Sequence, residues 1–412
     1  MKTIFSLLLL TPVILSGAST CVTCHKDLDG DLAAPVSLWE TSIHQRADVG
    51  CVDCHGGDAT SDDMDLAMSP SRGFVGVPSP KMIPTLCARC HSDERYMKKY
   101  APSIPVDQLE RYKTSVHGMG WARGDANVAT CASCHGAHDI VKATDPASHV
   151  YVTNVVNTCA KCHADEKLMK TYNISAEIVS DYRKGVHARA IEEKGDLAAP
   201  TCNDCHGNHG AAPPGIASIG FVCGNCHAMN QRLFNQSPHR EPWQDMELSQ
   251  CEECHGNHNI PPATDAMLDS KGHAVCLNCH DQGDGGYETM DKIHAILVGM
   301  TKRMEEVETR VLEAEHKGML MDDAALLLQD AKTSYIKGRT AVHAFSAEKV
   351  KDTVGEGLGN INKASIMADE AFKELTFRRK GLFVFLIIAL TLAFLLWLKI
   401  RQMDRRMPSN PE

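Results

Sequence analysis

The sequence predicts a mainly α-helical protein with a large irregular portion, and three observations support this fold class. A five-residue phrase, C-x-x-C-H, occurs nine times between residues 21 and 280, among many glycines and prolines. Apolar residues then recur at heptad spacing along residues 288–377. An uncharged, almost wholly apolar stretch of 18 residues, 381–398, follows. We therefore expect short helices and turns first, then a three-helix bundle, and finally one membrane-spanning helix.

The nine C-x-x-C-H phrases account for all 18 cysteines, and we number them motif 1 to motif 9 in chain order. The cysteines are Cys21, Cys24, Cys51, Cys54, Cys87, Cys90, Cys131, Cys134, Cys159, Cys162, Cys202, Cys205, Cys223, Cys226, Cys251, Cys254, Cys276 and Cys279. A c-type haem needs two thiols on one turn of chain for its vinyl groups, and an adjacent histidine for its iron. Zinc sites and disulfide frameworks also use paired cysteines, but neither requires a histidine after all nine pairs. The motifs therefore predict nine covalently attached haem c groups.

The motif region has only about 29 residues for each predicted haem. At that density the porphyrins themselves become the hydrophobic core, and the chain wraps around them. We therefore predict a nonahaem cytochrome c domain over residues 19–285, with little regular structure beyond short helices.

The two ends of the chain predict export and membrane anchoring. Residues 1–18 combine Lys2, an apolar run and the small residues Ser16, Gly17 and Ala18, the pattern of a signal peptide. Residues 378–400 predict a transmembrane helix, with residues 401–412 as a cytoplasmic tail. Because c-type haems are attached outside the cytoplasmic membrane, the haem domain should lie on the periplasmic side of the inner membrane.

The charge distribution is uneven. The chain has a formal charge of −10, and residues 378–412 carry seven basic and two acidic side chains, so residues 1–377 hold a formal charge of −15. Such an acidic region argues against nucleic acid as a partner. It suits basic protein partners, although an acidic surface that merely keeps the protein soluble explains it equally well. No phosphate-binding glycine loop or dinucleotide fingerprint is present.

The motif region contains internal repeats. Motifs 2, 4, 6 and 8 are followed by glycine, and the other five are not, which predicts units of two haems. The segment around motif 3, CARCHSDERYMKKY, matches that around motif 5, CAKCHADEKLMKTY, at an offset of 72 residues. We expect four two-haem units after a leading haem at motif 1, arranged in a bent row.

The histidines are numerous enough to give every predicted haem iron two histidine ligands. The proximal ligands follow from the motifs: His25, His55, His91, His135, His163, His206, His227, His255 and His280. The remaining histidines before residue 285 are also nine: His44, His117, His187, His239, His138, His209, His258, His149 and His273. The first four precede motifs 2, 4, 6 and 8 in similar contexts, and the next three recur as CHGxH. These counts predict bis-histidine coordination, with each CHGxH histidine on a neighbouring haem.

Haems 1 to 3 are the least determined, because motif 2 reads CHGGD and lacks the extra histidine. His149, His273 and His294 are candidate sixth ligands there. A methionine could serve instead, with Met64, Met68, Met82 and Met97 as candidates, or one iron could keep an open position. Met97 and Met169 occupy equivalent repeat positions, which favours packing against porphyrin over ligation.

Residues 286–377 predict a helical stalk. A first helix from about Glu288 has Ile293, Leu297, Met300, Met304, Val307, Val311 and Ala314 on its seam, and Gly318 ends it. Asp322 or Asp323 should cap a second helix, with Ala324, Leu328, Ala331, Tyr335, Gly338, Val342 and Phe345 on its seam. Ser346 should open a third, with Val350, Val354, Leu358, Ile361, Ala368, Phe372 and Leu375, which continues into the span. His316 and His343 lie in this stalk, where we expect half-buried polar residues rather than haem ligands.

The motif pairs APTCNDCHGNHGAAPP and VCGNCH, the upstream histidine segments and the C-terminal helices with one span resemble the doubled-CXXCH-motif multihaem cytochromes c of anaerobic respiratory chains. The resemblance covers roughly residues 20–400. It implies periplasmic electron transfer between the quinone pool, through an integral-membrane quinone-reactive subunit, and periplasmic cytochromes, terminal reductases or outer-membrane conduits. Tetrahaem quinol dehydrogenases carry their span at the N-terminus, and this chain does not, so direct quinol oxidation is not implied.

Two functions remain open at this stage. The first is a membrane-anchored electron conduit without a substrate of its own, and the histidine count favours it. The second is an enzyme similar to octahaem cytochromes that transform nitrite, hydroxylamine or tetrathionate, which requires one haem with an open position.

Overall fold

The computed structural model describes residues 19–215, 218–272 and 274–405, and within these ranges it contains helices and no strands. The mainly α fold class is thus confirmed. The predicted signal peptide, His273 and residues 406–412 of the predicted tail lie outside the described residues. The chain divides into two compact units, one formed by Met1–Gly215 with Gly256–Pro262 and the other by Ile216–His255 with Ala263–Glu412.

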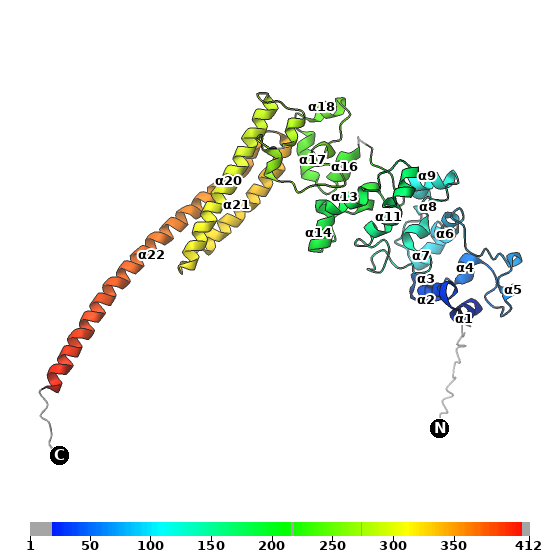
Figure 1. Ribbon diagram of the computed structural model, residues 1–412, viewed down its shortest axis with the longest axis horizontal. Helices are drawn as coiled ribbons and strands as arrows, with labels where there is room; N and C mark the ends of the chain where they lie inside the picture. The colour runs from blue at the N-terminus through cyan, green and yellow to red at the C-terminus, as the bar shows by residue number, and fades with distance from the viewer. Residues whose placement is uncertain (1–18, 216–217, 273, 406–412) are drawn as a thin grey trace, which may run out of the picture. The chain divides into compact units, whose positions relative to one another are not determined.

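The first unit consists of short helices joined by turns (Figure 1). They are α1 (Thr20–Lys26), α2 (Ala34–Thr41), α3 (Ile43–Arg46), α4 (Cys51–His55), α5 (Met64–Ala67), α6 (Ile83–His91), α7 (Glu94–Tyr100), α8 (Gln108–Thr114), α9 (Val116–Ala122), α10 (Cys131–His135), α11 (Val155–His163), α12 (Glu166–Thr171), α13 (Ile178–Lys184), α14 (Val186–Lys194) and α15 (Cys202–His206). Six of these helices contain one C-x-x-C-H motif each, namely α1, α4, α6, α10, α11 and α15. The repeat is visible in these helices. Relative to their motifs, α6 and α11 begin and end at the same positions, and α12 begins where α7 does but is one residue shorter.

The second unit combines short helices around motifs 7 to 9 with three long helices. The short ones are α16 (Ile219–Gly224), α17 (Ala228–Asn235), α18 (Arg240–Asp245), α19 (Glu252–His255) and the 3-10 turns η4 (Asp265–Leu268) and η5 (Val275–Asn278). The long ones are α20 (Gly285–His316), α21 (Asp322–Ala341) and α22 (Ala347–Asp404), with the 3-10 turn η6 (Val342–Ala344) between α21 and α22.

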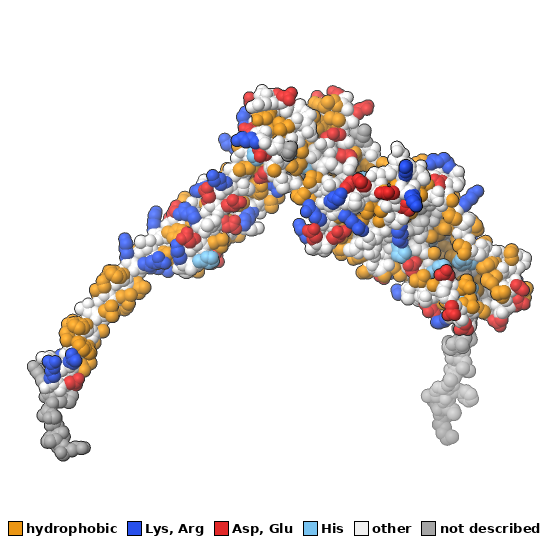
Figure 2. Space-filling model, viewed as in Figure 1, with side chains coloured by type: hydrophobic (Ala, Val, Ile, Leu, Met, Phe, Trp, Pro, Cys, Tyr) orange, Lys and Arg blue, Asp and Glu red, His pale blue; other side chains and the backbone are white. Residues whose placement is uncertain are grey.

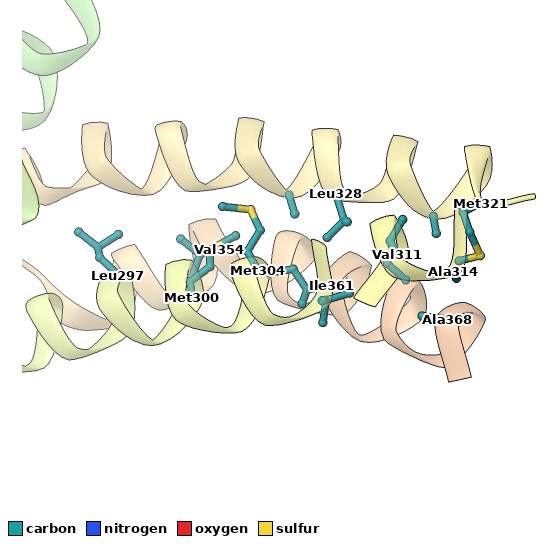
Figure 3. Packing of buried hydrophobic residues seen from close by; sticks show 14 of the residues in the cluster. Leu297, Met300, Met304, Val311, Ala314, Met321, Leu328, Val354, Ile361 and Ala368 are labelled. Atoms are coloured by element: carbon teal, nitrogen blue, oxygen red, sulfur yellow. The ribbon is translucent and has the colours of Figure 1, made fainter. Parts of the chain in front are cut away.

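The three long helices pack on one continuous apolar core (Figure 3). All seven predicted seam residues of α20 are buried, as are Ala324, Leu328, Ala331 and Gly338 of α21. A Cβ atom on Gly338 would lie 2.4 Å from Val354 Cγ1, and one on Gly357 would lie 2.6 Å from Ser334 Cβ. Glycine therefore lets α21 and α22 approach closely at these two positions.

The predicted details of α21 and α22 need two corrections. Met321, not Asp322 or Asp323, occupies the N-cap of α21, and α21 ends at Ala341, so the seam leaves its register beyond Gly338. Phe345 does not join this core, because its backbone is left-handed (φ +49°) and its ring lies against Phe234 instead. Gly357, Asn360, Ala364 and Ser365 are buried on α22 although the predicted seam omits them, because α22 packs against two helices and so buries a wider face.

The C-terminal part of α22 carries apolar side chains that the protein itself does not cover. The large apolar side chains from Leu382 to Leu398 are exposed, and Figure 2 shows hydrophobic side chains gathered around this part of the helix with basic side chains beyond them. Among the described residues, α22 is the one helix that is long and apolar enough to cross a membrane, and the mean hydropathy of its most apolar segment is 2.8. Eighteen helical residues span about 27 Å, close to the thickness of a bilayer's hydrocarbon core. The helix thus suggests membrane anchoring.

Candidate haem sites

The even-numbered motifs form short helices that end at the proximal histidine. Motifs 2, 4 and 6 are the five-residue helices α4, α10 and α15, and the third residue of each motif accepts a hydrogen bond from the backbone N–H before the first cysteine. The glycine after the histidine has a positive φ in all four even motifs: +69° at Gly56, +81° at Gly136, +80° at Gly207 and +70° at Gly256. Glycine is favoured there because side chains clash in this conformation. The alternation of glycine seen in the sequence therefore has a backbone cause.

Four proximal histidines use Nδ1 to bind the protein chain. His25 Nδ1–H donates to Leu32 O at 2.9 Å, and His55 Nδ1–H donates to Gly76 O at 2.6 Å. His206 donates to Ala212 O at 3.3 Å, and His280 to the Asp284 carboxylate at 3.1 Å. These bonds fix the tautomer and leave Nε2 as the free nitrogen, as in metal-binding histidines generally.

Seven proximal imidazoles each face a second imidazole at nearly the same distance. The ring centroids are separated by 6.2 Å in His91–His44, 6.1 Å in His55–His138, 6.1 Å in His163–His117, 6.1 Å in His135–His209, 5.9 Å in His206–His258, 5.9 Å in His280–His239 and 6.0 Å in His255–His343. Two imidazoles that hold one iron between them at about 2 Å per nitrogen place their centroids roughly 6 Å apart. The residues present therefore fit bis-histidine haem iron.

The seven pairs fall into two geometric classes. The rings are nearly parallel around motifs 2, 4, 6 and 8, with interplanar angles of 9°, 17°, 12° and 22°. They are strongly crossed around motifs 3, 5 and 9, with angles of 61°, 63° and 85°. The even and odd motifs thus build two different kinds of site, which we call parallel and crossed sites.

A simple rule connects each motif with its facing histidine. An even motif faces the CHGxH histidine of the next even motif, so His55 faces His138, His135 faces His209 and His206 faces His258. An odd motif faces the histidine that precedes the even motif just before it, so His91 faces His44 and His163 faces His117, as His280 faces His239. Each CHGxH histidine therefore faces the proximal histidine of a neighbouring motif rather than that of its own.

Recurring backbone bonds hold the upstream histidines in place. Ile43 N–H donates to Ile140 O at 2.7 Å, Val116 N–H to Ala211 O at 3.0 Å, and Val186 N–H to Ile260 O at 2.9 Å. Each donor is the first residue of its helix and each acceptor follows a CHGxH histidine. Each repeat is thereby joined to the one after it.

Helix caps fix the start of the helices that carry these upstream histidines. Ser42 and Ser115 cap α3 and α9 through their hydroxyls, which accept from Gln45 N–H and Gly118 N–H. His44, His117 and His187 each take the second position of a helix, in α3, α9 and α14. In α3 and α9 the serine cap therefore sets the register of His44 and His117, whereas α14 has Gly185 at its N-cap and no side-chain cap.

Sulfur positions show that consecutive motifs adjoin one another. The cysteine thiols hydrogen-bond across motifs in the pairs Cys87–Cys131, Cys159–Cys202 and Cys223–Cys251. Second cysteines lie close enough to interact electrostatically in Cys54–Cys90 and Cys134–Cys162. Motifs 2 to 6 thus follow one another without a gap in the first unit, and motifs 7 and 8 adjoin in the second.

Burial favours the neutral form of ten of the facing imidazoles. It is the main cause that lowers the pKa of His44, His91, His117, His135, His138, His163, His209, His239, His255 and His343. The positive charge of a facing imidazole lowers the pKa further at several of them, including His44 and His138. Neutral imidazole is the form that binds a metal.

His149 and His25 differ from the histidines in the seven pairs. His149 Nε2 lies 2.8 Å from the Asp139 carboxylate rather than facing a proximal imidazole. Among the described residues no imidazole faces His25 of motif 1, whose described contact is the bond from Nδ1 to Leu32 O. Met97 and Met169 are buried at 6% and 4% exposure, in agreement with a packing role.

The residue that sequence reasoning missed is His343 of η6, which faces His255. A signal for it exists in the repeat count. Four even motifs need four downstream histidines, but the chain contains only three of the CHGxH type, so one partner must come from elsewhere.

Comparisons with known proteins agree with these motifs. The family described as Cytochrome c3 matches residues 43–164, that described as Doubled CXXCH motif matches residues 244–285, and that described as Cytochrome c554 and c-prime matches residues 11–56. These ranges contain motifs 1 to 5, 8 and 9. No curated protein and no solved structure matches the chain. The family matches support covalently bound haem c.

Proposed function

From the premise that this chain is a multihaem c-type cytochrome, whose domains indicate electron transfer, we propose that it is a membrane-anchored electron conduit with one haem c at each of its nine motifs. Electrons pass from haem to haem along the motif succession, and no substrate binds on the way.

The observation that carries this proposal is the set of seven facing imidazole pairs at 5.9–6.2 Å. A haem iron with two histidine ligands has no position for a substrate, so its chemistry is electron transfer. The adjoining cysteines of consecutive motifs support the same function, because each cysteine fixes an edge of its haem and brings it next to the following one.

We place the conduit on the inner membrane, with the haem domain on the periplasmic side and the apolar part of α22 as its anchor. The uncovered side chains of Leu382 to Leu398 support the anchor. The proposed partners are an integral-membrane quinone-reactive subunit, and periplasmic cytochromes or reductases of an anaerobic respiratory chain. The acidic balance of residues 1–377 suits basic docking surfaces on those soluble partners.

Two measurements on the purified, fully oxidised protein test the proposal. Intact mass spectrometry should give the polypeptide with nine added haems. Electron paramagnetic resonance should then give predominantly low-spin ferric signals that cyanide and nitrite leave unchanged. Fewer haems would refute the count, and a general response to either ligand would refute the closed irons.

One observation favours a second candidate function, an enzyme of the nitrite, hydroxylamine or tetrathionate type. His25 has no facing imidazole among the described residues, so the haem at motif 1 is the place for an open coordination position. A high-spin signal from one haem, together with turnover of one of these substrates, would support the enzyme. A high-spin haem without turnover would leave the conduit in place.

A further inference from the structure

We propose that His343, in the turn between α21 and α22, is the second axial ligand of the haem at motif 8, so that the long helices close the C-terminal end of the haem array. The inference rests on haem attachment at motif 8, which is part of the proposed function.

The geometry of His343 matches the other parallel sites. Its ring centroid lies 6.0 Å from that of His255, at an interplanar angle of 22°. The three parallel sites built from CHGxH histidines have separations of 5.9–6.1 Å and angles of 9–17°. A half-buried polar histidine without a role in ligation would have no reason to adopt the spacing of a shared iron.

A backbone hydrogen bond engages Nδ1 of His343, the nitrogen that does not bind iron in the proposed site. Nδ1–H donates to Thr340 O at 3.0 Å, in the same way that the proximal His55 and His206 donate Nδ1–H to backbone carbonyls. Asn230 Nδ2 lies 3.3 Å from Nδ1 and 3.4 Å from Nε2 of the same ring. A backbone acceptor on Nδ1 orients Nε2 for a metal.

The repeat explains why the ligand must come from the helices. Each earlier even motif takes its second histidine from the next even motif, and motif 8 is the last of them. The segment before motif 8 shows the same end effect. It reads Ser-Pro-His, and Pro238 has no N–H at the position where Ile43, Val116 and Val186 bond to a following repeat.

The turn that carries His343 replaces the missing repeat in a second way. The ring centroid of Phe345 lies 3.9 Å from that of His239, the histidine that faces His280 of motif 9. Its left-handed backbone, φ +49°, is strained for an aromatic residue and persists only where packing holds it. One turn thus contacts the sites of motifs 8 and 9 together.

The test is His343→Ala in the full-length, haem-loaded protein, compared with wild type by electron paramagnetic resonance. One additional high-spin haem per chain should appear, and it should bind cyanide and return to low spin when imidazole is added. His316→Ala, at the end of α20, is the matched control and should match wild type. An unchanged low-spin spectrum of His343→Ala, with nine haems attached, would overturn the inference.

A second variant covers the case in which the alanine protein does not accumulate. His343→Met should keep all haems low-spin and move one midpoint potential upward, because methionine ligation raises the potential of a haem. An unaltered set of potentials would also overturn the inference. Haem attachment at motif 8 is measured separately, from the mass of the peptide that contains Cys251 and Cys254. Its absence in wild type would refute the proposed function instead.

Discussion

The long helices and the motif region are held together by different kinds of core. In α20–α22 and the connection between α20 and α21, 19 buried apolar residues form one cluster, and Leu297, Val307 and Val350 are completely buried. In the motif region the buried apolar residues are scattered, and Cys24, Cys54 and Cys205 are exposed. Cysteine is ordinarily among the most buried residue types, so the polypeptide leaves these positions for another group to cover. The difference teaches that side chains fold the helices, whereas haem must complete the fold of the motif region.

Removing one haem from the middle of the array should have the largest effect on this contrast. In Cys131→Ala/Cys134→Ala, motif 4 loses both covalent bonds, and the mass should fall by one haem. The motif region should lose more than about 4 kcal/mol of stability, since the loss of a bound metal group belongs to the largest class of effects. Hydrogen exchange should rise around α6, α10 and α11 and stay unchanged in α20–α22. Equal loss of protection in both regions would show that they share one core.

The reverse experiment is Leu297→Ala, which opens a cavity at a completely buried position of α20. The expected cost is about 3–5 kcal/mol, from lost burial and residual cavity. Denaturant unfolding followed by far-ultraviolet circular dichroism measures it, while the haem absorption of motifs 1 to 6 should be unaltered. Leu320→Ala is the control, because Leu320 is 91% exposed and its loss should change stability by less than about 0.5 kcal/mol. A cost for Leu297→Ala no larger than that of the control would refute the side-chain core.

A smaller effect is expected from Gly136→Ala, directly after motif 4. The backbone there has φ +81°, and an added Cβ would lie 2.2 Å from Asp139 Oδ1. The conformational cost is about 1–2 kcal/mol, and the displaced Asp139 adjoins His138, which faces His55. One parallel site should therefore change its low-spin signal. Gly124→Ala is the control, since it has φ +85° with nothing within 4 Å of the added Cβ, so it should lose stability without altering any haem signal.

The sequence predicted the parts of each site better than their combination. Spacing within a repeat is local, so it identified the proximal histidines and the upstream and CHGxH histidines that the structure places in six of the seven pairs. Pairing across repeats is not local. Ile43 bonds to Ile140 and Val116 to Ala211, almost a hundred residues apart, and the spacing within one repeat does not show which motif of another repeat each histidine faces.

His343 also shows what local sequence patterns do not predict. It follows the last residue of α21 by two positions, where a 3-10 turn breaks the heptad register, and its neighbours match no other histidine segment. On a helix pattern it reads as an ordinary polar residue. Only the end of the repeat, which leaves motif 8 without a successor, requires a histidine from outside the array. The seam of α20 was predictable in full because one straight helix keeps one register.

The smallest expected effect distinguishes the two kinds of site within the motif region. Ser115, 1% exposed, caps α9 by accepting from Gly118 N–H at 2.9 Å, and its hydroxyl donates to Tyr112 O at 2.6 Å. Ser115→Ala should cost about 1 kcal/mol, the usual loss for a helix cap. Because the cap sets the position of His117, the crossed site of motif 5 should change its low-spin signal while the parallel sites keep theirs.

The control for this cap is Ser180→Ala, since the exposed Ser180 hydroxyl also donates to a carbonyl three residues earlier, that of Glu177, but caps no helix. It should leave every haem signal unchanged. If Ser115→Ala altered the parallel signals instead, the crossed and parallel sites would not be separately held. The upstream helices would then act on the array as a whole rather than on the one iron that each histidine faces.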